Sequence, residues 1–177
     1  MSENPKEDLV RILERYDFSR HKTINGEEVD RGEGRGFGNN ISYLDTNIKF
    51  AVMSGSQGNY KNVETCLRTA EECYKNLERD YETIDFRGLE AYRRQEQVID
   101  LMFETRDKLE ALKPHLQTFT EYCRTAIKEE SEITEDSPGY KEIIEITKII
   151  TNPNRSRIYR DRLIGLKSEL KPSSLSQ

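Results

Sequence analysis

Residues 60–85, YKNVETCLRTAEECYKNLERDYETID, decide the fold of this chain. Apolar side chains recur in it at alternating steps of four and three residues: Val63, Leu67, Ala70, Tyr74, Leu77, Tyr81 and Ile84. A helix with apolar residues at this spacing presents a continuous seam to a neighbouring helix. We therefore predict one long helix over residues 59–85 that packs in the manner of a coiled coil.

A second long pattern follows between residues 89 and 126 and keeps the same average spacing. Its apolar members are Leu89, Tyr92, Ile99, Met102, Leu109, Leu112, Leu116, Phe119, Cys123 and Ala126. Arg106 interrupts the stripe, and Pro114 lies inside it. Because a proline removes one helical hydrogen bond and crowds the preceding turn, we expect either a kink there or a break into two helices.

Shorter helices are expected on both sides of these two. One covers residues 4–16, with Asn4 as its N-cap. Another begins at residue 41 and ends before the SGSQGN turn, and its apolar row is Ile41, Leu44, Ile48 and Val52. Residues 128–139 form an acidic connector that ends in the helix-start signal Ser137-Pro138. The isoleucine-rich segment after it would tolerate a strand, but a helix is favoured beside the other segments. A last helix begins at Asn152-Pro153 and should stop at Pro172.

Residues 23–39 show no helical periodicity, and we predict a long flexible loop there. The run NGEEVDRGEGRGFGNN at residues 25–40 holds five of the ten glycines. It matches neither the dinucleotide-binding nor the phosphate-binding glycine motif. Arg31, Arg35 and Phe37 could still contact a phosphate or stack on an unpaired base, and the alternatives are a plain linker or a partner-docking loop.

Composition agrees with an all-α fold, because charged and hydrophobic residues each make up 34% of the 177 residues. We predict an antiparallel helical bundle with coiled-coil-like long helices and a Gly-rich N-terminal loop. Its parts are an N-terminal amphipathic helix (1–22), the loop (23–39), one helical domain (40–171) and a disordered tail (172–177).

The formal charge of -5 argues against non-specific coating of DNA by the whole chain. The N-terminus lacks the cationic and apolar regions of a signal peptide, and no apolar run is long enough to cross a membrane. Cys66 and Cys73 would lie about 10 Å apart on one helix, which is too far for a disulfide. We expect a cytoplasmic, reducing location and no membrane association.

Catalytic chemistry is poorly supplied. The chain has only two histidines, His21 and His115, and it contains no HExxH or CxxC motif. Acidic pairs one helical turn apart do occur, which leaves a Mg²⁺-dependent hydrolase as a remote option. We expect no cofactor, no metal and no enzymatic activity.

The C-terminal helix carries a basic stripe beside its apolar row. On a helical wheel, Arg157, Arg160, Lys167 and Lys171 fall on one side. This stripe would pair either with an acidic stripe on the helix of residues 59–85, or with nucleic-acid phosphates. The acidic stripe consists of Glu64, Glu71, Glu78 and Glu82.

These patterns favour a non-enzymatic interaction protein that acts as a subunit, adaptor or regulator of a larger assembly. Leu67, Tyr74, Leu77 and Tyr81 are the interface candidates, although a place in the core is favoured for Tyr74 and Tyr81. The partners are other proteins or a second copy of the chain. The alternative is a small helical subunit that binds RNA or single-stranded DNA through the C-terminal basic helix and the Gly/Arg loop.

Overall fold

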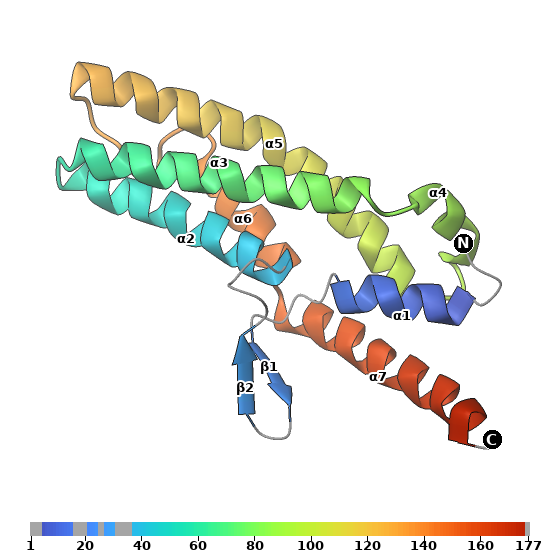
Figure 1. Ribbon diagram of the computed structural model, residues 1–177. Coiled ribbons are helices and arrows are strands. Elements are labelled where there is room, and N and C mark those ends of the chain that lie inside the picture. The colour runs from blue at the N-terminus through green and yellow to red at the C-terminus, as the bar shows by residue number, and fades with distance from the viewer. Residues whose placement is uncertain (1–4, 16–20, 25–26, 31–36, 176–177) are drawn as a thin grey trace.

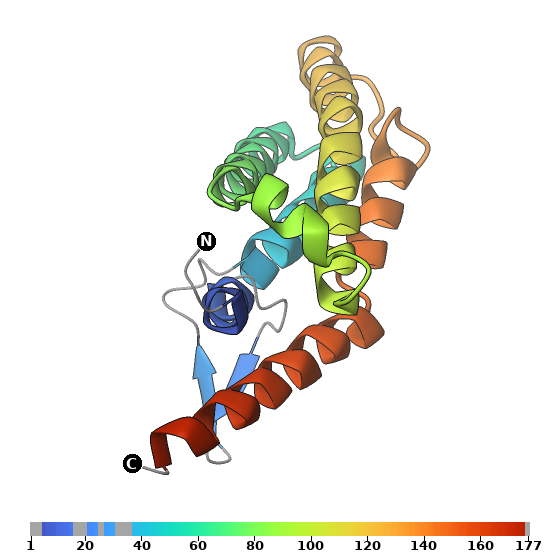
Figure 2. The same cartoon turned by 90° about the vertical axis from the view of Figure 1, so that its right-hand side faces the viewer.

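The computed structural model describes residues 5–15, 21–24, 27–30 and 37–175, and this part of the chain is predominantly helical (Figures 1 and 2). In chain order the elements are α1 (Pro5–Arg15), β1 (His21–Ile24), β2 (Glu27–Asp30), α2 (Phe37–Ser56), α3 (Tyr60–Glu82), α4 (Phe86–Leu89), η1 (Glu90–Tyr92), α5 (Gln97–Glu129), α6 (Tyr140–Ile150) and α7 (Pro153–Leu175). The expected helical fold class is confirmed. None of the described helices combines the length and the apolar character that crossing a bilayer requires.

Two short paired strands correct part of the loop predicted over residues 23–39, while residues 25–26 and 31–36 of that segment lie outside the described residues. β1 and β2 pair antiparallel, with His21 opposite Asp30 and Ile24 opposite Glu27, and α2 already begins at Phe37. The strands contain β-branched residues, and Asn25-Gly26 between them is a dipeptide type that favours two-residue hairpin turns. A search for helical periodicity does not detect such a local signal.

A tight turn joins α2 to α3, and the two helices run side by side (Figure 1). Gly58 occupies the left-handed region in this turn, with φ +75°. The Asn59 side chain caps α3 by accepting a hydrogen bond from the amide of Asn62 at 3.2 Å. The Asn62 side chain in turn donates to Ser54 Oγ at 2.6 Å, so the two helix ends are tied directly to each other.

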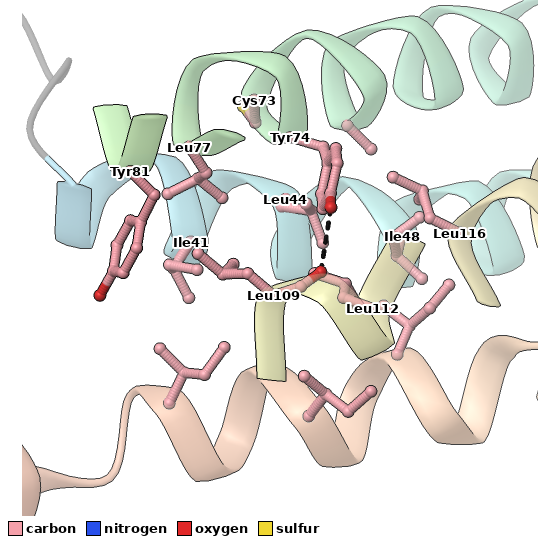
Figure 3. Close-up of a cluster of buried hydrophobic side chains, with 14 of the residues drawn as sticks. Ile41, Leu44, Ile48, Cys73, Tyr74, Leu77, Tyr81, Leu109, Leu112 and Leu116 are labelled. Carbon is pink, nitrogen blue, oxygen red and sulfur yellow. Dashed lines mark hydrogen bonds between the residues drawn. The ribbon is translucent and has the colours of Figure 1, made fainter. Parts of the chain in front are cut away.

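The core forms where α3 meets α2 and α5. All seven residues of the predicted α3 seam are buried, and so are Cys66 and Cys73 beside it, so the buried stripe is wider than two residues per heptad. Figure 3 shows the side chains that meet the seam from α2 and α5: Ile41, Leu44, Ile48, Leu109, Leu112 and Leu116. The apolar surface of α3 is therefore covered by helices of its own chain.

Helix α5 differs from the expected pattern at both its start and its middle. Residues 86–92 form α4 and η1, and α5 begins only at Gln97. It then continues through Pro114 to Glu129, so the predicted option of a break is wrong. Glu110, whose carbonyl lacks an amide donor opposite Pro114, is exposed like Pro114 itself. Water can solvate that carbonyl, which limits the cost of the proline.

The C-terminal third is helical as predicted, but its boundaries differ. Helix α6 begins at Tyr140, after the Ser137-Pro138 signal, because Ser137 Oγ accepts the amide of Thr134 and so forms part of the connector turn. Helix α7 runs through Pro172 to Leu175, so Pro172 does not stop it and the predicted tail is helical as far as Leu175. A proline removes a single hydrogen bond, and the residues after it can still bond to the turn before it.

Candidate interaction surfaces

The four residues predicted as a partner interface lie inside the chain. Leu67 and Leu77 have no exposed surface, and Tyr74 and Tyr81 are 7% and 6% exposed. The Tyr74 hydroxyl donates to the Leu109 carbonyl oxygen at 2.9 Å, which links α3 to α5 (Figure 3). Burial, together with nearby glutamates, raises the pKa of Tyr74 to about 12. The interface prediction is corrected, because α2 and α5 already cover this seam.

The acidic stripe of α3 pairs with α5 rather than with the C-terminal helix. Arg124 Nη2 lies 2.5 Å from Glu71 Oε1 and 3.3 Å from Glu64 Oε1, and Lys113 Nζ lies 3.2 Å from Glu78 Oε2. The hydrogen bonds to Glu71 and then Glu64 raise the pKa of Arg124. The predicted docking of the basic helix on this stripe is therefore wrong: α7 packs against α1 and α5.

Two arginines of α7 hold that helix in place. Arg155 donates to Glu104 at 3.1 Å and to Thr105 Oγ1 at 2.8 Å, and its side chain is only 14% exposed. Arg162 donates hydrogen bonds to both carboxylate oxygens of Glu96, from Nε at 2.7 Å and from Nη2 at 2.5 Å. Such charge-assisted, two-point contacts fix α7 against the N-terminal half of α5.

The candidate nucleic-acid residues are divided between described and undescribed parts of the chain. Arg157, Arg160 and Lys167 are exposed on α7, away from its buried row of Tyr159, Leu163 and Leu166. Ile164, which is 60% exposed, follows Arg160 by four residues and precedes Lys167 by three, so it lies among these cations.

The remaining candidates cannot be placed against this surface. Arg31 and Arg35 lie outside the described residues. Phe37 begins α2 and Lys171 lies within α7, but the described part of the structure does not include their side chains. The structure therefore groups only Arg157, Arg160 and Lys167, which we call the α7 basic patch.

A second exposed surface lies on α2 and was not predicted. Tyr43, Phe50 and Met53 are 42%, 46% and 53% exposed, and Thr46 is spaced between them. We call these four residues the α2 outer face. The sequence carries a signal for it, because Tyr43, Phe50 and Met53 recur at helical spacing on the side opposite the predicted row of Ile41, Leu44, Ile48 and Val52. Helix α2 is in fact apolar on two sides.

The described structure offers little for catalysis. His115 is half-buried on α5, and the side chain of His21 lies outside the described part. The three cysteines are buried and unbridged, and burial raises the pKa of each thiol, to about 11 for Cys73 and about 12 for Cys123. High thiol pKa values make these cysteines weak nucleophiles. Among the described residues, no group of three His, Cys, Asp or Glu side chains is placed to hold a metal ion.

A cavity of about 310 Å³ lies between α3 and α5. Its lining residues are Tyr74, Glu78, Tyr81, Glu82, Arg106, Leu109 and Glu110. Arg106 is the residue that interrupts the apolar stripe of α5. Its Cζ atom lies 4.7 Å from the ring centroid of Phe86 and 4.9 Å from that of Phe103. The lining has no histidine, cysteine, serine or threonine, so it contains no Ser/His or Cys/His pair.

No protein-family model matches the chain, and the comparisons with curated proteins and with solved structures also found no match.

Proposed function

We propose that this chain is a non-enzymatic interaction protein, an antiparallel helical bundle with coiled-coil-like long helices that acts as a subunit, adaptor or regulator. The α2 outer face is the surface that binds its protein partner. The observation that carries this proposal is the exposure of Tyr43, Phe50 and Met53 along one side of a single helix. Scattered exposed apolar residues are ordinary on proteins, whereas a contiguous row is typical of interaction sites.

The chemistry of α2 supports this role. Aromatic residues and methionine are enriched at protein interfaces, and charged residues are depleted at their centres. The whole of α2 contains only two charged residues, Asp45 and Lys49, in a chain in which 34% of residues are charged. Asp45 and Lys49 also pair with each other at 2.9 Å. A partner that covers the α2 outer face would therefore remove apolar side chains from water without burying an unpaired charge.

A pull-down from nuclease-treated native extract tests the proposal. The wild-type chain and two variants, Phe50→Glu and Gln117→Glu, are used as bait. Gln117 is exposed on α5, so its variant carries the same new charge at a site away from α2. We expect Phe50→Glu to lose the captured protein and Gln117→Glu to keep it. Equal capture by all three baits would contradict the proposal.

The second candidate function, binding of RNA or single-stranded DNA, is favoured by the α7 basic patch. Three exposed cations on one helix can neutralise backbone phosphates, and the affinity would then fall steeply as salt rises. A labelled oligonucleotide titrated at two salt concentrations, with the wild-type chain and with Arg157→Gln/Arg160→Gln, tests it by fluorescence anisotropy. Tight, salt-sensitive binding that the variant loses would favour this function over the first.

A further inference from the structure

We infer that the protein bound at the α2 outer face is a second copy of this chain, in a two-fold symmetric dimer in which α2 packs antiparallel against α2. This inference rests on the proposed function, because both concern the same surface. It goes further by naming the partner and the residues that meet.

The first argument concerns charge. Two copies of a chain with net charge -5 repel each other over most of their surfaces. The α2 outer face is uncharged, and the only acid on α2, Asp45, is already engaged by Lys49 at 2.9 Å and by the Thr147 hydroxyl at 2.7 Å. A basic partner would find no available carboxylate on this helix. The same face of a second copy is uncharged, so it brings no cation that would need a carboxylate on α2.

The second argument is that the face is complementary to itself, as a two-fold interface requires. Tyr43, Thr46, Phe50 and Met53 follow steps of three, four and three residues, the spacing at which paired helices interlock. In an antiparallel pair centred near Ile48, the small Thr46 of each copy lies opposite Phe50 of the other. Tyr43 lies opposite Met53, a pairing in which sulfur meets an aromatic ring. The large Phe50 thus fits beside the small Thr46 at the centre of the interface.

The charged residues that flank the pair of α2 helices weaken the dimer only modestly. The two Lys49 side chains approach each other near the two-fold axis, and each is neutralised by Asp45 on its own helix. No other charged residue of α2 takes part, because α2 has none. The like-charge contact is therefore screened within each copy.

The third argument is area, which sets the expected strength. Two partly exposed aromatic rings and a methionine offer about 100 Å² each, or about 300 Å² for one copy. This is the size of the largest apolar patch on an ordinary monomer. Two such faces together bury about 600 Å² of apolar surface, about half of the roughly 1,200 Å² at which stable specific interfaces begin, so we expect only a weak, reversible dimer with a dissociation constant on the order of 10 μM or weaker.

Sedimentation equilibrium of the full chain, from about 1 to 300 μM, tests this inference. We expect wild type and Gln117→Glu to dimerise and Phe50→Glu to weaken the dimer by at least about 100-fold, because the new carboxylates would be buried unpaired. Phe50→Thr should also weaken it, since two small residues then face each other. The swap Thr46→Phe/Phe50→Thr should restore it. A wild type that stays monomeric throughout, or a dimer that survives Phe50→Glu, would overturn the inference.

The pull-down separates this inference from the proposed function. If the wild type is monomeric but Phe50→Glu still loses a captured protein, the second copy is ruled out and the α2 outer face remains a partner site. If Phe50→Glu abolishes the dimer but keeps every other captured protein, the dimer stands and α2 does not recruit a different partner.

Discussion

Gly55, near the end of α2, can be used to measure how tightly the connector between α5 and α6 is packed. A Cβ atom added at Gly55 would lie 2.7 Å from Ile133 Cβ and 3.1 Å from Ile133 Cδ1. Ile133 has no exposed surface, and the connector around it is held by hydrogen bonds from Tyr60 to Ser131 and from Tyr122 to Glu132. The Ile133 Cβ cannot move away by a change of rotamer, so Gly55→Ala must strain the backbone.

The magnitude follows from two opposing effects. Overpacking in a core costs about 1–3 kcal/mol, while replacing glycine by alanine in a helix returns up to about 1 kcal/mol. We expect Gly55→Ala to lower the free energy of unfolding by about 1–2 kcal/mol. Ile133→Gly alone should cost about 3–5 kcal/mol, because it leaves a cavity and a more flexible backbone. In the Ile133→Gly background the Cβ atom that an alanine side chain at position 55 would meet at 2.7 Å is gone, so Gly55→Ala should be neutral or stabilising.

These four proteins form a double-mutant cycle: wild type, the two single variants and the double variant. Urea denaturation of each one gives the free energies of unfolding that the cycle compares. The expected signature is a change of sign for Gly55→Ala between the two backgrounds, with a coupling energy above about 1 kcal/mol. Additive effects, or a Gly55→Ala variant that is more stable than wild type, would refute the packing of Ile133 against α2.

Three further predictions concern α5 and α7. Arg155→Ala should lower the free energy of unfolding by about 2 kcal/mol in urea, because it removes charge-assisted hydrogen bonds from a largely buried side chain. Pro114→Ala should raise it by about 1–2 kcal/mol, because an amide then becomes available to the Glu110 carbonyl, and an unchanged or lower value would show that the helix is built around the proline. The hydrogen bond from Lys6, helped by Arg162, lowers the pKa of Glu169 below 4.5. Its stabilisation should therefore be present above about pH 4.5 and lost as the pH falls further, so denaturation of wild type and Glu169→Gln should differ at pH 6 and converge near pH 3. A constant difference across this range would contradict the ion pair.

Periodicity was sufficient to find the helices and to identify the core face of α3. It was sufficient because a buried row has to recur at helical spacing wherever it is covered. The same reasoning could not say what covers the row. The spacing favours a place in the core for Tyr74 and Tyr81, but it also suits a partner, and it does not name the covering helix. The pairing of Glu64 and Glu71 with Arg124 likewise depends on which helix is adjacent.

Other differences came from local effects that a helical repeat does not report. Pro114 and Pro172 are tolerated because each removes only one hydrogen bond, and Glu110, the residue whose carbonyl lies opposite Pro114, is itself exposed. The α2 outer face was missed for a different reason. An amphipathic helix is expected to have one apolar side, so once Ile41, Leu44 and Ile48 had been assigned to the core, Tyr43 and Phe50 were not considered as a second side.

Site-specific photocrosslinking tests the central claim most directly. A photoreactive benzoyl-phenylalanine at position 50 or position 164 is irradiated in nuclease-treated and untreated native extract. We predict covalent protein adducts from position 50 in both extracts, whether to a second copy or to another protein, and few from position 164. Adducts that form only at position 164 and disappear with nuclease would contradict the account, because the exposed surface in use would then be the α7 basic patch and its partner a nucleic acid.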